Sequence, residues 1–173
     1  MAPMVVEPAQ VRTFADFEAF YDWLAENHDR EPLTWIKIHK KGSGLPSIDW
    51  PQAVDAALCW GWIDGITKSL DQTSYLQRFT PRRSRSIWSQ VNVEKVAVLI
   101  ATGLMTDHGL KHVEAAKADG RWDAAYRTRG AAVPADLQAA LDADTDAAAG
   151  FSALSAQKRF AFIFRTEQMK TAA

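Results

Sequence analysis

A chain of 173 residues, 47% hydrophobic and 24% charged, is long enough for one soluble domain with a sizeable core. Its formal net charge of −1 disfavours a protein that coats nucleic acid through a general basic excess. The single cysteine excludes a disulfide within the chain and any metal site made of several cysteines. We expect a single domain, with residues 1–12 as a loose leader, 13–104 as a helix and sheet core, and 105–173 as a helical part.

The N-terminus shows no basic segment followed by an apolar one, which is the pattern of a signal peptide. No apolar run approaches the roughly 20 residues needed to span a bilayer. We therefore predict a cytoplasmic protein without membrane insertion. The oligomeric state has no signal in the sequence.

Two helices are predicted in the first third of the chain. Aromatic residues at three- and four-residue steps predict an amphipathic helix from Thr13, as the N-cap, to about Asn27. Asp49 is expected to cap a second helix that ends near Gly61, with Pro51 tolerated in its first turn.

Three strands are predicted around this second helix, over residues 34–40, 62–69 and 75–80, from alternating apolar and polar residues. A polar turn at 71–74 joins the last two strands, and we expect one antiparallel sheet. Alternation should place four residues of the middle strand on one face: Trp62, Asp64, Ile66 and Lys68.

The second half of the chain is predicted to be helical. Ser89 is expected to cap a helix that ends at Gly103, and Thr106 to cap the next one. Pro134 and Ser155 open two further helices. Three strands early and helices late indicate an α+β fold, a small antiparallel sheet packed with helices.

The stretch from Cys59 to Asn92 concentrates arginine and tryptophan residues, and no acid lies between Asp71 and Glu94. The residues concerned are Trp60, Trp62, Arg78, Arg82, Arg83, Arg85 and Trp88. Arginine between aromatic residues provides charge and a flat wall, which is typical of a pocket for an anionic ligand. A structural ion pair and a solvated basic loop remain alternative interpretations.

This pattern predicts that one pocket is lined by Trp62, Asp64, Arg78, Arg82 and Trp88. The ligand-binding candidates are Trp60, Trp62, Asp64, Gln77, Arg78, Arg82, Arg83, Trp88 and Asn92. Arg78 is expected to make the bidentate contact with the ligand, since a strand holds its guanidinium firmly. Asp64 is the best candidate for a general base, if any reaction is catalysed.

No metal or cofactor is predicted. His108 and His112 are four residues apart on one helix, but the stretch HGLKH lacks the glutamate of a zinc-protease motif, and further ligands are missing nearby. We expect both histidines to be exposed on the surface. Cys59 is expected to be a buried apolar residue, since no histidine lies near it in sequence.

The segments ALCWGWIDG (57–65) and SLDQTSYLQRFTPRRSRSIWSQVN (69–92) closely resemble the bacteriocin-protection, YdeI/OmpD-associated family. The resemblance includes LTWIKIHKKGSG, GLM and DGRW and extends over roughly residues 30 to 165. It implies a role in protection against bacteriocins and cationic antimicrobial peptides, with no established reaction or cofactor. It also implies a basic C-terminal tail, which is missing after the final Lys170-Thr171-Ala172-Ala173.

Three functions are compatible with the sequence. The first is binding of a small anionic or aromatic ligand in an Arg/Trp-lined pocket, as a stress-resistance protein or an enzyme. The second is a non-enzymatic module that docks a protein or peptide, and the third is binding of single-stranded nucleic acid. The near-neutral net charge disfavours the third, and a deep cleft rather than a flat surface would favour the first.

Overall fold

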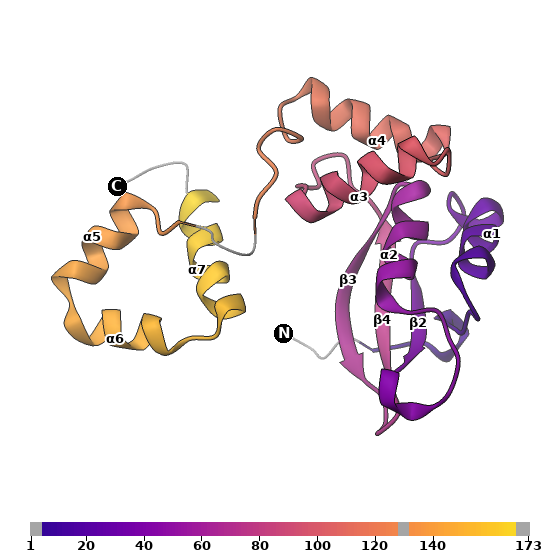
Figure 1. Ribbon diagram of the computed structural model, residues 1–173, viewed down its shortest axis with the longest axis horizontal. Coiled ribbons are helices and arrows are strands. Elements are labelled where there is room, and N and C mark those ends of the chain that lie inside the picture. Colours follow the sequence, from indigo (N-terminus) through magenta and orange to yellow (C-terminus); the bar gives the residue numbers. More distant parts are fainter. Residues whose placement is uncertain (1–4, 128–131, 169–173) are drawn as a thin grey trace. The chain divides into compact units, whose positions relative to one another are not determined.

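The computed structural model describes residues 5–127 and 132–168, and the chain divides into two compact units, residues 1–124 and 125–173. The first unit contains a sheet with four helices, and the second consists of helices (Figure 1). The elements of the first unit are η1 (Pro8–Gln10), β1 (Val11–Arg12), α1 (Phe17–Asn27), β2 (Thr34–His39), η2 (Lys41–Ser43), α2 (Trp50–Cys59), β3 (Trp62–Ser69), β4 (Ser74–Pro81), α3 (Gln90–Ala101) and α4 (Asp107–Ala118). The expectation of a single domain stays a prediction.

The sheet has four strands in the order β1-β2-β4-β3, and it is mixed rather than antiparallel. The pairs β2–β4 and β3–β4 are antiparallel, as predicted, whereas β1 pairs in parallel with β2. The three-stranded prediction and the loose leader over residues 1–12 were therefore wrong for Val11 and Arg12, which form β1. A strand of two residues is too short to show an alternating pattern.

A β-bulge in β3 changes which side chains share a face of the sheet. Asp64 pairs with Phe79, whereas Thr67 pairs with Gln77, so β3 has one extra residue between these pairs. Lys68 consequently faces away from Asp64, and the predicted shared face of Trp62, Asp64, Ile66 and Lys68 ends at the bulge.

Helices α1 and α2 cover the face of the sheet that carries Phe79 and Trp62 (Figure 1). The rings of Phe20, in α1, and Phe79 lie 5.5 Å apart, and both residues are fully buried. Helix α1 is capped by Asp16, whose side chain accepts a hydrogen bond from the backbone N–H of Ala19, and not by Thr13. Aromatic packing between these elements forms the core.

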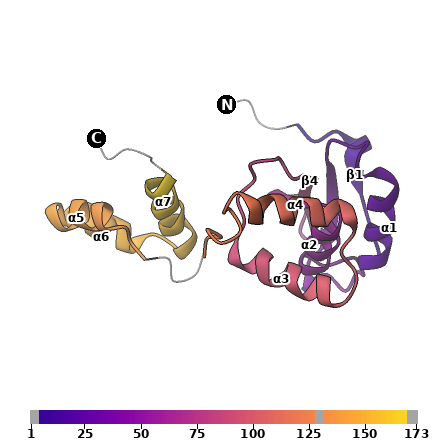
Figure 2. The same cartoon turned by 90° about the horizontal axis from the view of Figure 1, so that it is seen from above.

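Helices α3 and α4 lie beyond one end of the strands (Figures 1 and 2). Ser89 and Thr106 cap them as predicted. The backbone oxygen of Cys59, at the end of α2, accepts hydrogen bonds from the Thr106 hydroxyl at 2.6 Å and from the Thr106 N–H at 3.2 Å. A Cβ on Gly109 would lie 2.3 Å from the same oxygen, so α4 packs against α2 at a glycine. These contacts fix the position of α4.

The second unit contains α5 (Ala135–Ala143), α6 (Thr145–Ala153) and α7 (Ala156–Gln168). Pro134 precedes α5 and Ser155 precedes α7, as predicted, while α6 had no predicted start. Tyr126 stacks on Phe160 at 5.3 Å and contacts Phe164 at 5.4 Å, and this aromatic group holds the segment before α5 against α7. Residues 170–173, where the resemblance implied the start of a basic tail, lie outside the described residues.

Candidate functional site

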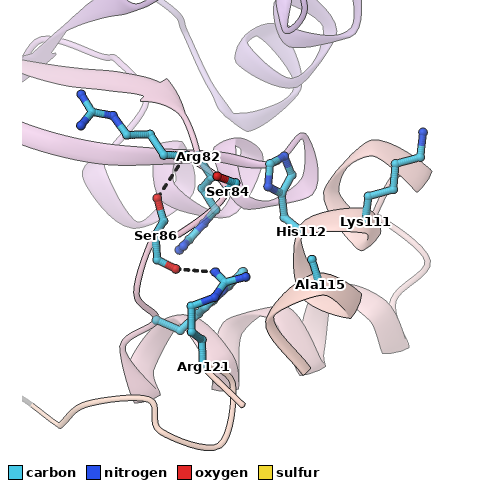
Figure 3. Close-up of a pocket in the computed structure, with 9 residues that line it drawn as sticks. Arg82, Ser84, Ser86, Lys111, His112, Ala115 and Arg121 are labelled. Atoms are coloured by element: carbon cyan, nitrogen blue, oxygen red, sulfur yellow. Dashed lines mark hydrogen bonds between the residues drawn. The ribbon is translucent and has the colours of Figure 1, made fainter. Parts of the chain in front are cut away.

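A cavity of about 240 Å³ lies between α4 and the segment that follows β4 (Figure 3). We call it the Arg82 pocket. It is lined by Arg82, Arg83, Ser84, Ser86, Trp88, Lys111, His112, Ala115 and Arg121. Five of these nine side chains are basic and none is acidic, so an anion would meet no negative lining group.

Hydrogen bonds hold the segment 82–88 in place. The backbone N–H of Arg82 donates to Gly61 O at 2.9 Å, directly after Pro81 ends β4. The Arg83 N–H then donates to the Ser86 hydroxyl at 3.0 Å, which closes a tight turn. The backbone of the segment is therefore fixed at both ends of the turn.

The Arg82 guanidinium lies over Trp88, with Cζ 3.6 Å from the ring centroid. Arg82 is 6% exposed and Trp88 is 2% exposed, and Nη1 of Arg82 donates to Ile87 O at 3.3 Å. Trp88 in turn makes an edge contact with Trp122, at 4.9 Å between ring centroids. The guanidinium is thus fixed by stacking and burial, which preserves its planar donor geometry for a ligand.

Arg121 closes the opposite side of the cavity. Its Nη1 donates to Ser86 O at 2.7 Å, as the dashed line in Figure 3 shows. Its Nε and Nη2 contact the Asp119 carboxylate at 2.8 Å. Arg121 therefore ties the turn after α4 to the segment 82–88, and its charge is balanced by Asp119.

His112 projects from α4 into the cavity, whereas Lys111 extends away from it (Figure 3). The close approach of His112 to α2 depends on Gly61, where a Cβ would lie 2.4 Å from His112 Cδ2. Burial, then the neighbouring His108 and Arg82, lower the pKa of His112. A neutral imidazole can donate and accept hydrogen bonds to a ligand at neutral pH.

A second pocket, shallow and open to solvent, has a volume of about 280 Å³ and lies over the helix-covered face of the sheet at the bulge. We call it the Asp64 pocket. It is lined by Trp50, Asp64, Thr67, Tyr75 and Gln77. The Trp50 indole Nε1 donates to Asp64 Oδ2 at 3.2 Å, and burial raises the pKa of Asp64 above its usual value.

The structure does not bring the nine candidate residues together. Arg82, Arg83 and Trp88 line the Arg82 pocket, while Asp64 and Gln77 line the Asp64 pocket. The other four line neither pocket: Trp60, Trp62, Arg78 and Asn92.

Strand register explains the position of Arg78, the expected anchor. Arg78 pairs with Trp35 on β2, and alternation places it on the face opposite Gln77 and Phe79. Asp64 shares the face of Phe79, so Arg78 and Asp64 lie on opposite faces of the sheet.

The three remaining residues, Trp62, Trp60 and Asn92, make contacts that stabilise the fold. Trp62 is fully buried and donates its indole N–H to His28 O at 3.1 Å. Trp60 stands against His28, with 4.7 Å between their rings. Asn92 lies in the first turn of α3, where its backbone N–H donates to Ser89.

The contribution of α4 and of the turn after it to the site was missed. Arg121 and Ala115 drew no functional prediction, and His112 was considered only for metal binding. The one available signal was the spacing of His108 and His112, which marks a helix face that approaches another element.

These histidines are half-buried, in contrast to the surface position predicted from the sequence. The rings of His28 and His108 lie 4.5 Å apart, and those of His108 and His112 lie 5.6 Å apart. Within the described part of the chain, no three or more His, Cys, Asp or Glu residues are arranged to hold a metal ion. Among the same residues, none of the helices is both long and apolar enough to cross a membrane.

A family model covers most of the unit that contains both pockets. Residues 12–112 match the family described as Domain of unknown function (DUF8412), and the chain belongs to this family. Residues 131–173 match a second family, Bacteriocin-protection, YdeI or OmpD-Associated, which confirms the resemblance found in the sequence.

The extent of that second match differs from the expected one. It covers 131–173 instead of roughly 30 to 165, and the segments 57–65 and 69–92 that suggested it lie within the match to the domain of unknown function. Among curated proteins and among solved structures, no match to the chain was found.

Proposed function

We propose that this protein binds a small ligand through an anionic group, a carboxylate or a phosphate, in the Arg82 pocket. The observation that carries the proposal is the Arg82 guanidinium, which is 6% exposed and stacked on Trp88 at the edge of a cavity without acidic lining residues. Fixed guanidinium groups recognise both anions through paired hydrogen bonds.

The other lining residues support the same chemistry. Arg83 adds a second arginine, the hydroxyl of Ser84 can donate a hydrogen bond, and His112 can do so as a neutral ring. The cavity volume of about 240 Å³ is below the roughly 300–1,000 Å³ of drug-sized sites. The pocket is thus suited to an anionic group with a small apolar part, and its concave form favours a small ligand over a flat docking face.

A protective role follows by extension from the family matched by residues 131–173. Under this proposal, ligand binding in the first unit contributes to bacteriocin resistance, and the protein acts in the cytoplasm. Bacteria that produce an Arg82→Met variant should then lose protection that the wild-type protein provides, at equal protein levels.

Titration of ¹⁵N-labelled protein with phenyl phosphate and with phenylacetate tests the binding directly and separates the two anion types. The indole N–H resonance of Trp88, assigned by its loss in Trp88→Phe, should shift in a saturable way with at least one of them. Benzyl alcohol, a neutral compound of similar shape, should leave it unchanged. If neither anion shifts this resonance more than benzyl alcohol does, the proposed function is refuted.

A further inference from the structure

The Asp64 pocket combines a partly buried carboxylate with two aromatic walls, and the proposed anion site does not use it. Trp50 is the first residue of α2 and is 43% exposed, although it is a large aromatic residue. Its indole N–H is held by Asp64 Oδ2 at 3.2 Å, which orients the ring beside the carboxylate. Tyr75, on β4, supplies the second aromatic side chain.

The remaining polar lining is occupied with holding the bulge. Gln77 is 2% exposed, and its Nε2 donates to Gly65 O at 2.9 Å. Its Oε1 accepts from the Thr67 hydroxyl at 2.6 Å, so both ends of the amide are used within the sheet. Asp64 is therefore the charged group that the pocket offers to a ligand.

The electrostatics of the pocket favour a positively charged ligand. A carboxylate that has lost part of its hydration is stabilised when a cation joins it. Two positive charges act on Asp64, that of Arg82 and, after it, that of Lys95. Arg82 is stacked on Trp88, and Lys95 is paired with Asp55 at 2.5 Å. The negative charge of Asp49 acts on Tyr75 and adds to the unfavourable field for an anion.

We infer that the Asp64 pocket binds an alkylammonium group, with the ammonium paired to Asp64 and the alkyl part against Trp50 and Tyr75. Aromatic faces attract organic cations, most strongly at tryptophan. A primary ammonium supplies three N–H donors, of which one or two can reach the carboxylate. The volume of about 280 Å³ matches a small amine.

Titration with n-butylammonium chloride tests this inference, with sodium chloride at equal ionic strength as the blank. The Trp50 indole N–H resonance should shift in a saturable way, because this group is bonded to Asp64. Sodium butyrate, which has the same alkyl chain and the opposite charge, should not shift it. A response to butyrate equal to that of n-butylammonium would overturn the inference.

Two variants complete the experiment. Asp64→Asn keeps the shape of the side chain and should weaken n-butylammonium binding about tenfold or more. Glu94→Gln removes an exposed acid from α3, outside the pocket, and should leave the affinity within about twofold. Trp50→Leu provides an independent variant if Asp64→Asn does not fold. In this variant the backbone amide resonances of the lining residues Asp64 and Gln77 report the titration, and binding should also be weaker. Unchanged affinity in a folded Asp64→Asn or Trp50→Leu protein would refute the site, whereas phenyl phosphate binding at the Arg82 pocket should be unaffected by Trp50→Leu, which changes no charge.

Discussion

The Arg82 guanidinium lies 3.6 Å from the centre of the Trp88 ring, and both side chains are almost fully buried. A cation in contact with an aromatic face and removed from water interacts more strongly than an exposed pair. The segment after β4 therefore presents a charge in a fixed orientation, instead of a mobile arginine.

This contact should appear as a coupling energy in the stability of the protein. In a double-mutant cycle with Arg82→Met and Trp88→Leu, we expect a coupling of about 1–2 kcal/mol in the free energy of unfolding. Urea denaturation of the four proteins measures it. The pair Lys117 and Trp122, 5.4 Å apart with Lys117 exposed, is the matched control and should couple by less than about 1 kcal/mol. Equal coupling in both pairs would mean that burial does not strengthen the Arg82 contact.

Gly61 should be more sensitive to substitution than another glycine with the same backbone conformation. Gly61 and Gly103 have φ of 69° and 73°, so alanine is strained at both positions. Only at Gly61 would the new Cβ meet a neighbour, His112 Cδ2 at 2.4 Å, while nothing lies within 4 Å at Gly103. Gly103→Ala should cost about 1 kcal/mol and Gly61→Ala about 2–4 kcal/mol of unfolding free energy. If urea denaturation showed similar losses of unfolding free energy for Gly61→Ala and Gly103→Ala, α4 would be able to move away from the new Cβ without loss of stability.

The histidine cluster should make the protein less stable in mild acid. Burial is the main cause that lowers the pKa of His108 and of His112 in the folded state. The unfolded chain then binds more protons near and below its ordinary histidine pKa of about 6.5, so unfolding is favoured as the pH falls from about 8 to about 5.5. The contribution of the two neutral histidines to stability is complete above the unfolded-state pKa. It is lost as the pH falls toward the lower pKa of these histidines in the folded protein.

The comparison of wild type with a His108→Gln/His112→Gln protein isolates this effect, because other titrating groups contribute equally to both. The urea midpoint of the wild type should fall more steeply over this pH range than that of the variant. Parallel pH profiles would show that these histidines do not govern the acid response.

Cys59 should be unreactive until the protein unfolds. It is fully buried, and burial raises the pKa of its thiol to about 12. We expect the rate of labelling by a thiol reagent to increase with urea in parallel with the unfolded fraction. Rapid labelling in native buffer would indicate local opening at the end of α2.

The elements of the fold were largely predictable because strong local signals mark them. Asp49, Ser89 and Thr106 each cap a helix, as their positions before apolar periodic segments indicated. The bulge after Asp64 was not predicted, since Gly65 is its only trace in the sequence. That one extra residue moves Lys68 to the other face, so the polar residues of β3 could not be assigned to faces from alternation alone.

The composition of the site was harder to predict than its location. The arginine and tryptophan residues of the segment 82–88 were identified, because an acid-free basic cluster is visible in the sequence. Their partners are His112, on α4, and Arg121, in the turn after it, and tertiary packing of α4 on Cys59 and Gly61 brings both close. Such contacts between distant segments leave no periodic pattern.

The affinity for an anionic ligand in Arg82→Met and Arg85→Met proteins tests the central claim most directly. Both changes remove one positive charge from the same segment, but Arg85 is exposed and does not line the pocket. With phenyl phosphate or phenylacetate, whichever binds, Arg82→Met should lower the affinity about 10- to 100-fold and Arg85→Met less than about fivefold. Circular dichroism confirms that each variant is folded, and Arg82→Lys, which keeps the charge without the planar fork, should give an intermediate loss. Equal, small losses in the Arg82→Met and Arg85→Met proteins would contradict the account and show that the cluster is a solvated basic surface.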